Sequence, residues 1–273
     1  MQLLCVAVDA IHFFSLGLTD AYYNSWVFIM KPDWTDREYS YFSNIHNVGL
    51  CFFAVCTGVV MYFTKKYRHV QIIGLSIRAI GEGINYYAAS NRKDVTFIMA
   101  KILISCGAGM IVTTTAVAAP ASAPHRDMAG AMCILHMVAQ VTGSIANSIS
   151  ASVWNSRVPK ALAKYLPDVS EAERELIFGN IRRARRTLPH AAVYDAYTEG
   201  IRPLLAAAIG TTILALALAC FIPEMKLDRR HNNIENHKIV RMHSKHEVTD
   251  EAIKEQVAKA EERARNEVVK ELK

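Results

Sequence analysis

Several signatures of soluble chemistry are missing from this chain of 273 residues. It has no G-x-x-x-x-G-K-[ST] loop for nucleotide phosphates, no H-E-x-x-H zinc motif and no nucleophile elbow. An ATP-driven pump and a membrane hydrolase therefore have no support in the sequence, and we expect no enzymatic activity, no catalytic residues and no cofactor. The net charge of +6 comes without a recognisable nucleic-acid-binding module, so we expect no nucleic-acid partner.

Cysteine is scarce and is not spaced to bind a metal. There are six cysteines, all within or at the edges of apolar runs, and no repeated C-x-x-C is present. We interpret them as small packing residues rather than as disulfides or ligands, and we expect no metal site. They are Cys5, Cys51, Cys56, Cys106, Cys133 and Cys220.

The start of the chain has no signal-peptide pattern. An apolar run begins at once, without a basic segment before it, and further apolar runs follow instead of a cleavage site. A chain that opens within two residues of a membrane helix is expected to be truncated.

What the sequence does contain is a series of six apolar runs. Each runs for about 20 residues or more, the length that a helix needs to cross the hydrocarbon core of a bilayer. The runs start near Met1, Tyr41, Val70, Val95, Met128 and Ile201. We therefore expect an all-α integral membrane protein with six transmembrane helices.

The distribution of charge predicts how the chain is divided. Residues 1–154 should form five transmembrane helices, 155–200 an extracytoplasmic amphipathic loop, 201–223 the last transmembrane helix and 224–273 a charged cytoplasmic tail. The positive-inside rule places the basic turn at 65–69 and the basic residues after Pro223 on the cytoplasmic side of the membrane. The loop at 155–200 is also basic although we expect it outside, but the rule has little force for a long folded loop.

The loop shows an amphipathic pattern, with Val158, Leu162 and Leu166 on one face. A second group, Leu176, Ile177 and Ile181, follows, and such helices are expected to lie along the membrane surface. The tail from Glu247 to Lys273 fits a solvated charged helix or a helix that binds a partner.

The residues most informative about function are ionisable side chains inside the apolar runs. Such a side chain costs at least about 2.5 kcal/mol at bilayer depth, so it must face protein or water. The candidates for proton coupling or transport are Asp9, Asp20, Arg78, Glu82 and Lys101.

Each candidate also has a structural interpretation. Arg78 and Glu82 are four residues apart, so they share a helix face and can form either a structural pair or a pair that opens when the glutamate binds a proton. Lys101 could extend its ammonium to the membrane surface, and Asp20 could lie at the interface. Asp9 is deeper and is the better candidate for a proton site.

Polar and aromatic side chains near these positions are candidates for the wall of a substrate cavity. They are Tyr22, Tyr23, Gln140 and Asn147, chosen for polarity and helix position. Aromatic residues at this depth could equally form an interfacial belt. His12 and His136 are interpreted as hydrogen-bonded structural residues, with a proton relay as the alternative.

Four segments carry the pattern of one family: residues 43–49, Gly107-Ala-Gly109, residues 153–167 and residues 194–205, with Ile222-Pro223 at the end of the last run. They resemble the C-terminal half of fungal siderophore-iron transporters of the major facilitator superfamily. The resemblance covers roughly residues 1–227. It implies half of a facilitator bundle, with inverted three-helix repeats, and proton-coupled uptake of ferric siderophore chelates at the plasma membrane or an endosomal or vacuolar membrane.

The chain departs from this pattern at several points. Lys101 stands where an uncharged polar residue is expected, and Ala146-Asn147 where more glycine is expected. Transporters of this kind bind substrate between two halves, so the missing N-terminal half or a second copy of the chain would be a partner, besides lipid, protons and the chelate. The alternatives are a non-transporting fragment or membrane partner, and a glutathione or drug antiporter driven by protons.

Overall fold

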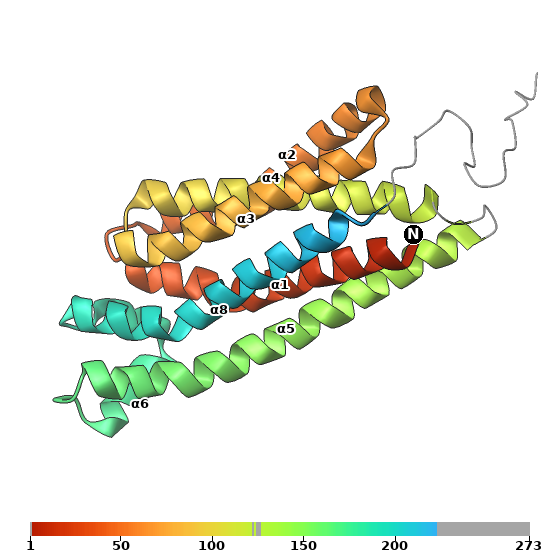
Figure 1. The fold of residues 1–273 in the computed structure, drawn as a ribbon. Coiled ribbons are helices and arrows are strands. Elements are labelled where there is room, and N and C mark those ends of the chain that lie inside the picture. Colours follow the sequence, from red (N-terminus) through yellow and green to blue (C-terminus); the bar gives the residue numbers. More distant parts are fainter. Residues whose placement is uncertain (1, 122, 124–126, 223–273) are drawn as a thin grey trace, which may run out of the picture. The chain divides into compact units, whose positions relative to one another are not determined.

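The structure, a computed structural model, describes residues 2–121, 123 and 127–222, and in this part of the chain it consists of eight α-helices (Figure 1). The helices are α1 (Gln2–Met30), α2 (Asp36–Thr64), α3 (Tyr67–Asn91), α4 (Asp94–Ala121), α5 (Met128–Tyr165), α6 (Glu171–Gly179), α7 (Ile181–Arg186) and α8 (His190–Ala219). The predicted tail, 224–273, lies outside the described residues. The predicted all-helical fold is confirmed for the described part.

Five of these helices, α1, α2, α4, α5 and α8, are long and apolar enough to cross a membrane. The sixth expected span corresponds to α3, which has 25 residues but does not reach the same hydropathy. Its polar residues Gln71, Arg78, Glu82 and Asn85 explain this, and all four are buried against neighbouring helices. Five spans are therefore supported, and the crossing by α3 stays a prediction.

The segment between the last two long helices is shorter than the sequence suggested. Helix α5 continues to Tyr165, eleven residues beyond Trp154, and α8 begins at His190 rather than at Ile201. Pro159 lies inside α5 without ending it. The predicted face of Val158, Leu162 and Leu166 is fully buried, which gives this extension a packing surface.

The loop that remains contains α6 and α7. Ser170 caps α6 by accepting a hydrogen bond from the backbone N–H of Glu173, and Asn180 caps α7 through the N–H groups of Arg182 and Arg183. Of the second predicted apolar group, Ile177 is buried, whereas Leu176 is exposed. The extracytoplasmic position of this loop stays a prediction.

The long helices pack in a regular pattern. Helix α1 packs mainly on α5 and α8, α4 packs mainly on α2 and α3, and α3 also packs on α8 (Figure 1). Two glycines allow close approach. A Cβ at Gly17 would lie 2.6 Å from the carbonyl oxygen of Gly143 on α5, and one at Gly107 would lie 2.5 Å from that of Gly74 on α3. Small residues are typical of such contacts between membrane helices.

The core of the bundle has two apolar clusters separated by a polar layer. The cluster at one end includes Trp26, Phe97 and Tyr197, and the cluster at the other includes Val8, Ile111 and Ala219. Along α1, α3 and α8, most of the buried polar side chains lie between the residues that contribute to these clusters. The candidate site is this layer.

Candidate functional site

Arg78 is the centre of the polar layer. Its side chain is completely buried, and its Nη1 lies 2.5 Å from His12 Nδ1 on α1. Its Nη2 donates to Ser15 Oγ at 3.4 Å, and Ser15 in turn shares a hydrogen bond of 2.9 Å with Thr212 on α8. One guanidinium group thus links three helices, α3, α1 and α8.

Glu82 is the ionic partner of Arg78. Its Oε1 lies 3.7 Å from Arg78 Nη2, one helical turn away, so the predicted pairing within α3 is present. Neither carboxylate oxygen has a hydrogen-bond partner, and the Tyr23 hydroxyl and Asn85 Oδ1 are likewise buried without one. Because buried polar groups are usually hydrogen-bonded, this cluster can accept protons or water.

Asp9 forms a second polar contact at the α1–α4 interface. Thr115 on α4 donates to its Oδ1 at 3.0 Å, and only 3% of Asp9 is exposed. His136 on α5 is near enough to interact with this carboxylate electrostatically. The structure therefore places Asp9 inside the bundle rather than at an open end, although nothing in it brings Asp9 into contact with Glu82.

Lys101 is turned into the bundle rather than toward the membrane surface. Its Nζ donates to Asn24 Oδ1 on α1 at 2.7 Å and lies 4.5 Å from the ring centre of Phe42 on α2. The ring of Tyr23 is 5.4 Å away. The structure thus differs from the alternative in which its ammonium reaches the surface.

The other predicted residues lie at the surface of the bundle. Asp20 on α1 and Gln140 and Asn147 on α5 are exposed, whereas Tyr22 is half-buried and stacks on Trp154 with ring centres 4.7 Å apart. The exposed three could face a cavity, but the structure does not bring them together with Arg78 and Glu82. Their role as a cavity wall stays a prediction.

Ion pairs tie the loops together at the end of the bundle where α1 ends. Lys31 contacts Asp94 at the start of α4, and Arg92 contacts Asp195 near the start of α8. Arg185 of α7 donates to the backbone carbonyls of Lys31, Pro32 and Trp34. The loop helix α7 therefore holds the α1–α2 turn through a single guanidinium.

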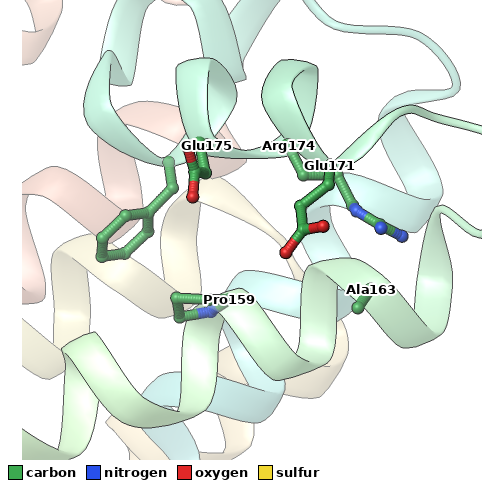
Figure 2. A pocket seen from close by; sticks show the side chains of 6 residues that line it. Pro159, Ala163, Glu171, Arg174 and Glu175 are labelled. Carbon is green, nitrogen blue, oxygen red and sulfur yellow. The ribbon is translucent and has the colours of Figure 1, made fainter.

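Two surface hollows lie near this end, and neither is lined by a predicted site residue. One of about 260 Å³ separates α6 from the end of α5, and Figure 2 shows Glu171 and Glu175 of α6 above Pro159 of α5. The other, of about 310 Å³, is polar and includes Arg92, Asp195, Glu199 and Arg202.

Sequence reasoning missed the partners of the predicted residues. His12, Ser15 and Thr212 complete the surroundings of Arg78, and Asn24 and Thr115 hold Lys101 and Asp9. A signal was present for α1, where Asp9, His12, Ser15 and Thr19 recur every three or four residues and so share one face. This polar stripe in an apolar run marks the face that Arg78 of α3, Thr115 of α4 and Thr212 of α8 contact.

Comparison with known proteins agrees with the proposed resemblance. The chain is 27% identical over 212 residues to the MFS siderochrome iron transporter 1 of Ajellomyces capsulatus, covering 76% of the chain and 36% of that protein. It is 27% identical to the low affinity heme transporter str3 of Schizosaccharomyces pombe over 84% of the chain. It is 23% identical to the siderophore transporter fer7 of Mycosarcoma maydis over 85% of the chain.

These relatives are longer than the chain, which spans about a third of their length. No family model matches the chain, and no solved structure matches it. The chain is thus similar over most of its length to fungal siderophore-iron transporters of the major facilitator superfamily, in agreement with a C-terminal half. The similarity and the five apolar helices together indicate an integral membrane protein.

Proposed function

We propose that this chain forms a six-helix half of a proton-coupled transporter of ferric siderophore chelates. The observation that carries the proposal is the similarity of most of the chain to proteins named as siderophore or siderochrome iron transporters. A charged pair buried among the helices fits this function, because ionisable groups at membrane depth are costly and mark ion or substrate pathways.

Two pairs of helix contacts support the idea of inverted three-helix repeats, whereas α5 packs on α8 more extensively than α2 packs on α3. If α1, α2 and α3 correspond to α4, α5 and α8, the contact of α1 with α5 corresponds to that of α4 with α2. Likewise the contact of α1 with α8 corresponds to that of α4 with α3. Transporters built from such repeats bind substrate near the bilayer midplane, and the position of the polar layer between the two apolar clusters fits such a site.

We assign proton coupling to Glu82 and Asp9, with Arg78 as the counter-ion. Protonation of Glu82 would cancel its attraction to Arg78 and leave that guanidinium to His12 and Ser15, which belong to another helix. Such a change in partners can favour one helix arrangement over another, as alternating access requires. The second wall of the cavity would come from an N-terminal half or from another copy of the chain.

Uptake of ⁵⁵Fe from a ferric siderophore tests this function in yeast cells that lack siderophore uptake of their own. We expect cells with the chain to accumulate more iron than empty cells, and a protonophore to abolish the difference. Arg78→Met should abolish uptake, whereas Gly58→Ala, at a site with nothing within 4 Å of an added Cβ, should not.

Two further arms separate the alternatives. Heme supplied in place of the siderophore distinguishes the two kinds of iron chelate named among the relatives. If the chain reaches the membrane but neither chelate enters above the level of empty cells, the chain does not transport iron chelates by itself, and the fragment interpretation replaces the proposal.

A further inference from the structure

Lys101 is held as a buried cation with few partners. Only 5% of the residue is exposed, and its ammonium lies against the rings of Phe42 and Tyr23. An ammonium has three N–H donors, and in the described part of the chain only Asn24 Oδ1 accepts one of them. The aromatic faces stabilise the charge, but they do not replace the missing acceptors.

No carboxylate within the described residues forms an ion pair with Lys101, unlike the case of Arg78 with Glu82. The nearest charged and titratable neighbours are Asp20 on α1 and His46 on α2, which interact with this region electrostatically from beyond contact distance. Asp20 is exposed and His46 is half-buried. The positive charge of Lys101 is therefore incompletely neutralised by the protein.

Lys101 is covered by side chains at the place where α1 and α2 meet α4. Helices α1 and α2 each pack on α4, which carries Lys101, and touch each other mainly through side chains: Tyr39 of α2 donates a hydrogen bond to the Asn24 carbonyl, and the Tyr23 ring faces Phe42. Asn24, which accepts the hydrogen bond of Lys101, and His46, which interacts with it only electrostatically, are both half-buried. An anionic group that displaces these side-chain contacts between α1 and α2 would meet the two unused donors of the ammonium.

We propose that Lys101 selects iron chelates that carry negative charge, such as those with free carboxylates, over neutral ones. This inference rests on the proposed function and concerns the substrate class. A hydrogen bond between a buried ammonium and a carboxylate is charge-assisted and strong. Asp20, which lies nearby with the opposite charge, weakens the same preference.

Binding of two ferric hydroxamate chelates to the purified chain in lipid nanodiscs tests the proposal. The two probes are of similar size, one neutral and one with free carboxylates, and binding is followed by quenching of tryptophan fluorescence. Trp34, whose ring centre lies 5.2 Å from that of Phe42, provides a reporter near Lys101. Size-exclusion profiles check that each variant is folded.

The variants should separate charge recognition from structure. Lys101→Gln should weaken binding of the anionic probe by about ten- to a hundred-fold, the loss expected for one hydrogen bond to a charged group, and change the neutral probe little. Lys101→Arg should retain the preference. Asp20→Asn should tighten binding of the anionic probe several-fold, a change opposite in sign that a purely structural role for Lys101 does not produce.

Each other outcome is informative. If wild type binds the neutral probe as tightly as the anionic one, or if Lys101→Gln weakens both equally, the charge selection is overturned while the proposed function stands. If wild type binds neither probe, the proposed function and this inference both fail.

Discussion

The interaction between Arg78 and Glu82 gives the sharpest prediction about what holds the polar layer together. Their charged atoms are 3.7 Å apart and both side chains are at most 1% exposed. Coulomb's law with an effective dielectric constant of about 20 gives an attraction of about 4.5 kcal/mol at this distance. Removal of one partner leaves the other charge buried, which typically costs about 3–5 kcal/mol.

The two single variants should differ. Arg78→Met should destabilise the bundle more than Glu82→Gln, because Glu82 makes no hydrogen bond and loses its ion pair with the arginine. In Glu82→Gln, Arg78 keeps its contacts with His12 and Ser15. The double variant should be less destabilised than the sum of the singles, by about 2–3 kcal/mol.

Unfolding by SDS in mixed micelles, followed by circular dichroism, measures these free energies. The same cycle on Lys164 and Glu199, an exposed pair with N and O 2.9 Å apart, is the matched control and should show no coupling above experimental error. If the effects of Arg78→Met and Glu82→Gln simply add, or if Glu82→Gln is the more damaging change, the described ionic link between these residues is refuted.

Three further predictions address packing, the loop and the sixth span. Gly107→Ala should destabilise the bundle by about 1–3 kcal/mol in the same SDS titration, because its Cβ would meet the backbone of α3. Gly58→Ala, whose Cβ meets nothing, should be neutral or slightly stabilising, and equal effects of the two changes would contradict the close α3–α4 contact. Arg185→Ala should make the α1–α2 turn more sensitive to protease, because the Arg185 side chain donates hydrogen bonds to three carbonyls of that turn. Arg182→Ala, at an exposed position, should leave cleavage unchanged, and unchanged cleavage in both variants would refute the stabilisation of the turn by Arg185. Single cysteines placed in the two loops that flank α3, in a cysteine-free background, should be labelled from opposite faces of the membrane, and labelling from one face would show that α3 does not cross.

The helical architecture could be predicted because run length and apolar composition are local properties. The link between Arg78 and Glu82 could also be predicted, since residues four apart on a helix are neighbours. The contact of Arg78 with His12 joins residues that are 66 positions apart, and it depends on where the rest of the bundle places α1 and α3. No local pattern contains that information.

The bounds of the last two long helices were not predictable for a different reason. Pro159 and the polar residues after Trp154 resemble a loop locally, yet the buried face of Val158 and Leu162 lets α5 continue to Tyr165. Packing against the rest of the bundle outweighs the local cost of a proline. The orientation of Lys101 depends in the same way on Asn24 and Phe42, which other helices supply.

Transport by the purified chain in proteoliposomes tests the central claim most directly. With an inward proton gradient and a ⁵⁵Fe-labelled ferric siderophore outside, we predict accumulation above that of protein-free vesicles, abolished when the gradient is collapsed and when Glu82 is replaced by Gln. Iron that stays at the level of protein-free vesicles, or accumulation that is indifferent both to the gradient and to Glu82→Gln, would contradict the account.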